Sequence, residues 1–266
     1  MQEISSIFLS ECQALARLCE HLTPDQWQLH TDFHGWTPWD EIAHLAYFDE
    51  TGLKAATDPQ CFIAQRKLLM AELKTGREIS AIARSRFGHL EGPALLERWC
   101  LCHEALSRQL RGLDSKARLP WYGPDMSARS FATARLMETW AHGQDIWDAL
   151  ELPRAVSPGL RNIAHLGVTT YGWTFVNRGM SVVLPQPFVS LEAPDGTTWS
   201  WGEASDRDYV RGPALDFALL VTQRRHRDDT QLAWAGTGAE LWTRSAQCFA
   251  GPPADGPAPG TRVRRN

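Results

Sequence analysis

The sequence predicts an α+β protein in which a four-helix bundle is followed by a small C-terminal α+β domain. Its 266 residues are enough for one large domain or two ordinary ones with real cores. Apolar residues recur with a helical period before Pro153, whereas short β-rich runs appear only after Gly179. We therefore expect a helix bundle over residues 1–152 and an α+β domain over 153–250. Residues 251–266, rich in proline and glycine, are expected to be a disordered tail.

The first part is expected to contain five helical segments, four of which are the principal helices of the bundle. Thr37-Pro38 begins one of them, because threonine is a good N-cap and proline suits the first helical position. Asp58-Pro59 breaks this helix, and the loop 119–125 contains two prolines and a glycine. The expected helical segments are 3–22, 37–57, 61–88 with an interruption at Gly76, 93–112, and one from Ser127 or Ser130 to about Leu150.

The second part mixes helices with short strands. Pro194-Asp195-Gly196 is a hairpin turn signal between two of the β-rich runs. The expected strands are 181–184, 188–193 and 197–201. The expected helices are 158–177, one that begins at Gly212-Pro213, and 239–249.

Composition limits the class of protein. The formal net charge is −4, so the chain has no electrostatic attraction to nucleic acid or anionic lipid, and we expect neither as a partner. The basic cluster Arg262-Val263-Arg264-Arg265 is interpreted as part of a solvated tail. The N-terminus lacks the pattern of a signal peptide, no segment approaches the ~20 apolar residues of a membrane span, and the six cysteines show no disulfide framework. These features indicate a cytoplasmic protein.

Glu138 and His142 form the first candidate for a functional site. They are four residues apart, so both side chains leave the same face of a helix. A carboxylate and an imidazole at this spacing can hold one divalent metal, although such pairs are also common as surface contacts. His44, in another helical segment, is the candidate third ligand, and three protein ligands leave a coordination position open for chemistry.

Two motifs resemble a known family. Trp36-Thr37-Pro38-Trp39-Asp40-Glu41-Ile42-Ala43-His44-Leu45 is similar to the W-T/S-x-x-D-x-x-x-H-L run of the DinB-like metal-binding bundles. The stretch from Glu138 to Ile146 resembles the E-x-x-x-H-x-x-D run of one branch, the mycothiol-dependent maleylpyruvate isomerases. The expected C-terminal domain also fits that branch, so the resemblance spans nearly the whole chain.

The resemblance implies a zinc-like divalent ion held by His44, Glu138 and His142, with water or substrate completing its shell. In those isomerases a low-molecular-weight thiol adds to an activated alkene of a small-molecule substrate and leaves after rotation, and a metal can activate the thiolate. Asp145 is either a residue that orients a ligand or a helix-surface carboxylate. Asp40 is interpreted as an acid that stabilises the start of its helix.

The run from Thr222 to Asp229 resembles the T-G-R helix end of the same family, whose arginine reaches the active cleft. Arg224 aligns with that arginine and is our candidate for a catalytic and cofactor-binding residue, since its guanidinium suits a carboxylate. The alternative is a basic residue that the helix dipole favours at a helix C-terminus. Gln223 stands where the family usually has glycine, so the local backbone is expected to differ.

Three functions follow in order of preference. The first is a metal-dependent isomerase or thiol transferase that uses mycothiol or an equivalent thiol. The second is a metal-dependent hydrolase or another Lewis-acid enzyme that acts through bound water without a thiol. The third is a non-catalytic protein that binds a metal or ligand.

Overall fold

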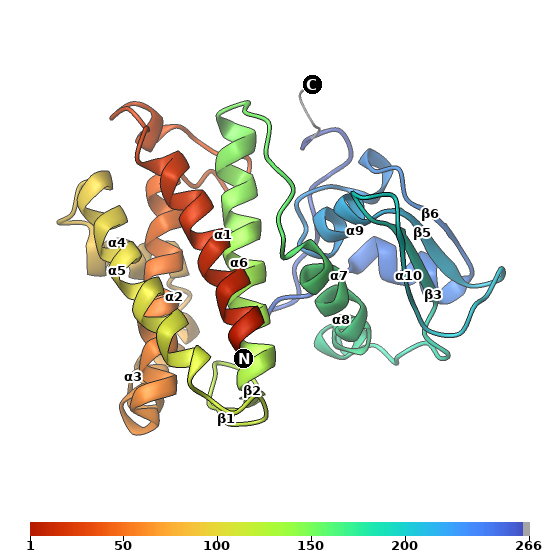
Figure 1. The fold of residues 1–266 in the computed structure, drawn as a ribbon, viewed down its shortest axis with the longest axis horizontal. Helices are drawn as coiled ribbons and strands as arrows, with labels where there is room; N and C mark the ends of the chain where they lie inside the picture. Colours follow the sequence, from red (N-terminus) through yellow and green to blue (C-terminus); the bar gives the residue numbers. More distant parts are fainter. Residues whose placement is uncertain (263–266) are drawn as a thin grey trace. The chain divides into compact units, whose positions relative to one another are not determined.

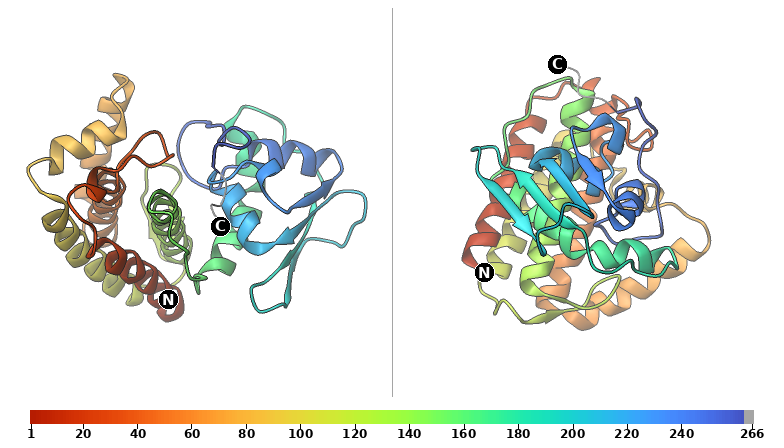
Figure 2. Two further views of the ribbon diagram at one scale, coloured as in Figure 1. Left: turned by 90° about the horizontal axis from the view of Figure 1, so that it is seen from above. Right: turned by 90° about the vertical axis from the view of Figure 1, so that its right-hand side faces the viewer.

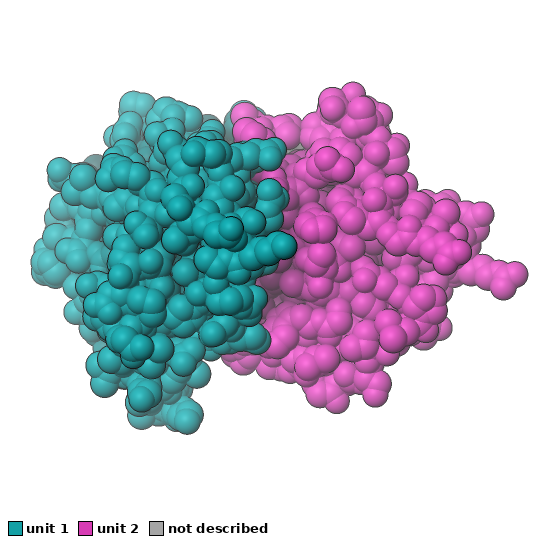
Figure 3. Space-filling model, turned by 60° about the horizontal axis from the view of Figure 1, so that its bottom comes forward, with its two compact units in different colours: residues 1–154 teal, residues 155–266 magenta. Residues whose placement is uncertain are grey.

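The computed structural model describes residues 1–262, and the chain divides into two compact units. The boundary lies between Arg154 and Ala155, two residues after the predicted one (Figure 1 and Figure 3). No helix in the described part of the chain is long and apolar enough to cross a membrane. The α+β class and the order of the two parts are as predicted.

A four-helix bundle forms unit 1. In it α1 and α2 each pack against both α5 and α6, which closes a ring of four helices (Figure 1). The two shorter helices α3 and α4 pack against α2 on its outer side (Figure 2). The elements of unit 1 are α1 (Gln2–Cys19), the 3-10 turn η1 (Gln26–Gln28), α2 (Pro38–Thr57), α3 (Pro59–Lys74), α4 (Ile79–Phe87), α5 (Gly92–Arg111), the strand pair β1 (Arg118–Leu119) and β2 (Met126–Ser127), and α6 (Ala128–Ala149).

The start of α2 is fixed by its own sequence. The Thr37 hydroxyl accepts from the Asp40 amide, while the Asp40 carboxylate accepts from the Thr37 amide at 3.0 Å, which forms a capping box. Asp40 therefore stabilises its helix as expected, and Arg84 of α4 also donates to it at 2.5 Å. At the other end, Asp58 terminates α2 and its side chain caps α3, so α3 begins at Pro59, two residues earlier than predicted.

The interior of the bundle holds a buried charged network. Arg135 of α6 donates to one oxygen of Asp49 on α2 at 2.8 Å, and Trp99 of α5 donates to the other oxygen at 2.8 Å. All three side chains are almost completely buried. Burial opposes the charge on Arg135, but Asp49 more than compensates and raises its pKa above the usual value. The network joins three helices of the bundle one turn away from Glu138.

Unit 2 is a four-stranded mixed sheet with helices on one face (Figure 1). The strand order is β4-β3-β5-β6, with β3 and β5 parallel and the outer pairs antiparallel. Val189, Leu191 and Val210 are fully buried, and α9 packs against β3 and β5. The elements are α7 (Leu160–Thr169), α8 (Tyr171–Asn177), β3 (Phe188–Glu192), β4 (Thr198–Trp201), β5 (Tyr209–Pro213), α9 (Ala214–Val221), the 3-10 turn η2 (Arg227–Asp229), β6 (Ala233–Ala235) and α10 (Thr237–Ser245).

The predicted hairpin is present, but other details of unit 2 differ from expectation. β3 and β4 pair antiparallel around Pro194-Asp195-Gly196, where Gly196 takes a positive φ of 81°. Residues 181–184, predicted as a strand, form no strand, because no neighbouring segment pairs with them in the described sheet. The predicted helix 158–177 is divided at Thr170 into α7 and α8.

The segment after α10 runs along unit 2 where we expected a disordered tail from residue 251. Gln223 donates to the Ala254 carbonyl at 2.7 Å, and Arg178 pairs with Asp255 at 3.0 Å. The amide of Gly260 donates to Asp229. Residues 263–266, and with them most of the basic cluster, lie outside the described residues.

Candidate metal centre

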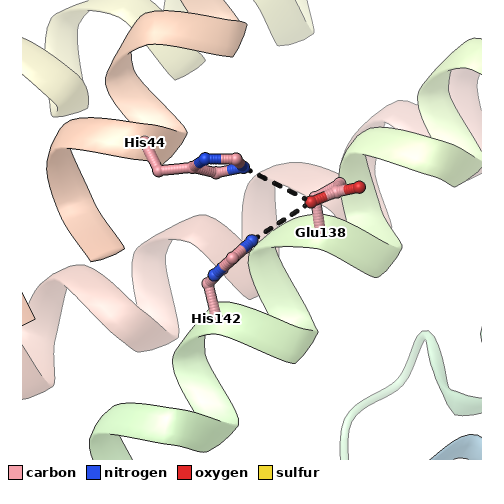
Figure 4. Close-up of side chains that lie close together, drawn as sticks. All are labelled: His44, Glu138 and His142. Atoms are coloured by element: carbon pink, nitrogen blue, oxygen red, sulfur yellow. Dashed lines mark hydrogen bonds and ion pairs between the residues drawn. The ribbon is translucent and has the colours of Figure 1, made fainter. Parts of the chain in front are cut away.

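The structure brings the three predicted ligands together. His44 comes from the middle of α2, while Glu138 and His142 come from successive turns of α6 (Figure 4). The Nε2 atoms of both histidines face the same carboxylate oxygen, Oε2 of Glu138, at 3.6 Å from His44 and 3.2 Å from His142. The His142 side chain is only 5% exposed, so this pair is not a surface contact. The α2–α6 packing of the bundle therefore places three ligand atoms around one point.

The spacing of these atoms suits a small divalent ion. Zinc bonds to nitrogen and oxygen are about 2.1 Å long, so two ligands of a tetrahedral zinc ion are about 3.4 Å apart. The observed 3.2 and 3.6 Å lie on either side of that value. Glu138 and His44 are 21% and 13% exposed, so the side of the cluster away from His142 is open to a fourth ligand.

A second group, formed by Glu41, His142 and Asp145, also brings potential ligands close together. Oε2 of Glu41 lies 2.6 Å from Nδ1 of His142, which is a hydrogen-bond distance and too short for an ion between the two atoms. Asp145 is 4% exposed, so the interpretation of it as a helix-surface carboxylate is wrong. Glu41 therefore contacts the Nδ1 side of the His142 ring, whereas the proposed ion position is on the Nε2 side, next to Glu138.

His142 is thus placed between two carboxylates. Nδ1 lies 2.6 Å from Glu41, and Nε2 lies 3.2 Å from Glu138. An ionised carboxylate can only accept, so a proton on Nδ1 suits the contact with Glu41. Nε2 then needs a proton or a cation to avoid repulsion between its lone pair and the Glu138 carboxylate. Partial burial opposes ionisation of Glu138, but interactions with His142 and then His44 outweigh it and hold the pKa of Glu138 well below its usual value. The carboxylate is therefore ionised, as a metal ligand must be.

Aromatic rings enclose the histidines. The Trp36 ring stacks on His142 with 5.8 Å between centroids and lies 5.3 Å from His44. Phe33 contacts His142 edge-on at 5.3 Å, and Phe48 contacts His44 at 4.7 Å. Two of these rings come from the segment before α2 and one from α2 itself. They give the site an apolar wall that strengthens electrostatic interactions inside it.

Glu41 is the site residue that the sequence analysis missed. It lies in the motif from Trp36 to Leu45, but its partner His142 is 101 residues away, so the motif alone does not indicate its role. Its other oxygen accepts from the Thr31 hydroxyl at 3.2 Å. The sequence does show an acidic residue, Glu41, one turn before His44 on a largely apolar helix face. That pattern does not identify His142 as its partner.

Arg224 lies in unit 2, in the turn that follows α9. It is 3% exposed, and its Nη1 donates at 2.7 Å to the carbonyl of Thr222, the C-cap of α9. This contact is the one expected of a basic residue at a helix C-terminus. Gln223 takes a positive φ of 59°, so the backbone keeps a conformation that glycine favours, contrary to the expected difference.

Four cysteines of unit 1 are poor nucleophiles. Burial raises the pKa of Cys12, Cys19 and Cys102 well above the usual value, and it raises the pKa of the half-buried Cys100 to about 11. Since the thiolate is the reactive form, these four side chains are unreactive at neutral pH.

Known proteins of the same architecture carry this bundle. The crystal structures of a mycothiol-dependent maleylpyruvate isomerase and of its histidine-to-alanine mutant each match with a TM-score of 0.52 at 16% identity, over 82% of this chain and 87% of theirs. At that identity the match shows a common fold.

Sequence relatives extend over almost the full length. The uncharacterized proteins Rv0036c and MT0041 of two Mycobacterium tuberculosis strains are each 38% identical over 247 residues, which cover 93% of this chain and 95% of theirs. Residues 8–147 match the family model described as the mycothiol maleylpyruvate isomerase N-terminal domain. The chain therefore belongs to the mycothiol maleylpyruvate isomerase family.

Proposed function

We propose that this protein is a metal-dependent enzyme in which a low-molecular-weight thiol adds to an activated small-molecule substrate and is later eliminated. The convergence of His44, Glu138 and His142 on one point is the observation that carries the proposal. Membership of the isomerase family supports the choice of mycothiol or an equivalent thiol. The site of action in this proposal is the cytoplasm.

His44, Glu138 and His142 would hold the ion, and two imidazoles with one carboxylate favour zinc. A bound divalent ion would lower the pKa of a coordinating thiol, so that the nucleophilic thiolate forms at neutral pH. Glu138 is already ionised and His142 is held by Glu41, so the ligands are prepared for the ion. Trp36, Phe33 and Phe48 would keep bulk water from the histidines.

In this proposal the nucleophilic thiol comes from outside the chain, as the family's use of mycothiol suggests. The four cysteines of the bundle with raised pKa values cannot supply a thiolate at neutral pH. An external thiol can instead approach the exposed edge formed by Glu138 and His44.

Metal analysis and thiol binding test the proposal together. Purified wild-type protein should contain one equivalent of divalent metal by mass spectrometry, and the His142→Ala variant should lose it. His89→Ala is the matched control, because His89 is exposed on the same unit and should keep the metal. Absence of metal from the wild type, or its retention in His142→Ala, would contradict the metal centre.

Calorimetry of the metal-loaded protein with mycothiol and with glutathione tests the thiol. Binding of mycothiol that disappears in metal-free protein would support the proposal, and turnover of maleylpyruvate by absorbance would test the isomerase reaction directly. A metal-loaded protein that binds neither thiol would be better described as a hydrolase or another Lewis-acid enzyme that acts through bound water.

Arg224 is proposed to bind a carboxylate of the substrate or of the thiol. Its guanidinium suits that group, and the family resemblance assigns the position to the cleft. Arg224→Ala should weaken mycothiol binding, whereas Arg244→Ala should not, because Arg244 is exposed and pairs with Glu240. Equal affinities in the two variants would contradict a role of Arg224 in thiol binding.

A further inference from the structure

Glu41 occupies a variable position of the W-T/S-x-x-D-x-x-x-H-L run, yet it is fully buried beside the metal centre. A buried carboxylate is costly unless it is paired and hydrogen-bonded. Oε2 of Glu41 lies 2.6 Å from Nδ1 of His142, which is closer than Glu138 lies to either histidine. The burial of Glu41 therefore needs a functional or structural explanation.

We infer that Glu41 is a positioning residue that fixes the Nδ1–H tautomer and the ring orientation of His142, so that Nε2 is held toward the ion. This inference rests on the metal centre of the proposed function. A metal-binding histidine commonly donates its other N–H to a carboxylate, and that partner sets the tautomer and makes the imidazole a better donor. Here the carboxylate comes from α2 and the histidine from α6, so the contact also fixes one helix against the other.

The second oxygen of Glu41 connects the ligand to the aromatic wall. The Thr31 hydroxyl donates to Oε1 of Glu41 at 3.2 Å, and the Thr31 amide donates to the Trp36 carbonyl at 2.7 Å. Trp36 in turn stacks on the His142 ring. One carboxylate thus holds the histidine through one oxygen and the segment that covers it through the other.

Two substitutions separate positioning from packing. Glu41→Gln keeps an acceptor oxygen for Nδ1–H, whereas Glu41→Leu has a similar volume and removes it. We expect zinc affinity, measured in the full-length protein by competition with a chromophoric chelator, to fall by about 10–100-fold in Glu41→Leu. Glu41→Gln should recover most of that loss. Thr31→Val is the matched control for the second oxygen and should change zinc affinity much less than Glu41→Leu.

Nuclear magnetic resonance of the histidine nitrogens provides a measurement that a change in side-chain packing alone would not alter. In zinc-loaded protein labelled with 15N-histidine, the Nδ1 proton of His142 should be observable and protected from exchange in the wild type and in Glu41→Gln. It should exchange rapidly in Glu41→Leu. The unfolding midpoint of each metal-free variant is measured alongside, so that a loss of fold is recognised.

Zinc binding by folded Glu41→Leu with wild-type affinity and a protected Nδ1 proton would overturn the inference while leaving the metal centre intact. Failure of the wild type to bind zinc would instead overturn the proposed function, and the inference with it. Equal loss of affinity in the Gln and Leu variants would show that charge alone matters and would contradict the positioning role.

Discussion

Asp49 illustrates how single residues hold the bundle around the site. Its two oxygens accept from Arg135 and Trp99, which lie on different helices, and all three side chains are buried. Replacing such a pair by apolar residues is often harmless, but removal of one partner leaves an uncompensated buried charge. The stability of the bundle therefore depends on both partners being present together.

Asp49→Ala should lower the free energy of unfolding by about 3–5 kcal/mol, because the Arg135 guanidinium would remain buried without its counter-ion. Glu72→Ala is the control: it removes a surface pair with Arg77, and such pairs contribute about 0–1 kcal/mol. Urea unfolding monitored by circular dichroism measures both. Similar losses of unfolding free energy in the two variants would show that the buried Asp49 network contributes no more to stability than a surface ion pair.

Gln223 offers a second test at the residue scale. Its φ of 59° is unfavourable for any residue with a Cβ, yet its side chain donates to the carbonyls of Ala246 and Ala254. Glycine and alanine both remove these hydrogen bonds, but only glycine relieves the backbone. Gln223→Gly should therefore be more stable than Gln223→Ala by about 1 kcal/mol in thermal unfolding, the reverse of the order found within helices. An alanine variant at least as stable as the glycine variant would contradict this.

The site was predictable from the sequence where it depended on local spacing. Glu138 and His142 share a helix face, and His44 lies in a motif with its own cap, so these three could be named in advance. Glu41 could not, because its role depends on the angle and register at which α2 meets α6. For Asp145 the sequence left open a ligand-orienting role and a position on the helix surface. Its burial in the structure excludes the surface position.

At the scale of whole elements, helices with terminal signals were predicted well. Thr37 and Pro38 fix the start of α2, and Ser127 caps α6. β5 was missed because it ends in Gly212 and Pro213, which suggest a helix start, and β6 was missed because it is only three residues long. β5 is a strand because it pairs in parallel with β3, and such a long-range pairing leaves little local signal.

The cap of α2 can be tested directly. Thr37→Ala removes the acceptor for the Asp40 amide and should cost about 1 kcal/mol of stability, whereas Thr37→Ser keeps the hydroxyl and should cost much less. Chemical denaturation of the two variants gives the comparison. A serine variant as unstable as the alanine variant would show that the threonine methyl group, and not the cap, matters.

At the scale of the whole molecule, the candidate metal centre and Arg224 belong to different units. His44, Glu138, His142 and Glu41 all lie in unit 1, which has its own buried apolar residues. A fragment of residues 1–154 should therefore fold and bind zinc with the affinity of the full chain, while it loses mycothiol affinity if Arg224 acts as proposed. Calorimetry of fragment and full chain provides the test. A fragment that folds but does not bind zinc would show that unit 2 is needed for the centre.

The three proposed ligands come from two helices that are distant in the sequence. This arrangement affects how long the protein persists in the cell. An unfolded chain cannot assemble this set of ligands, so an ion bound as proposed would stabilise only the folded state. By mass action, each tenfold rise in free metal above the dissociation constant would then add about 1.4 kcal/mol to the folded state. Metal starvation would increase the unfolded population that proteases degrade, so that the supply of the ion would control how much of the protein persists.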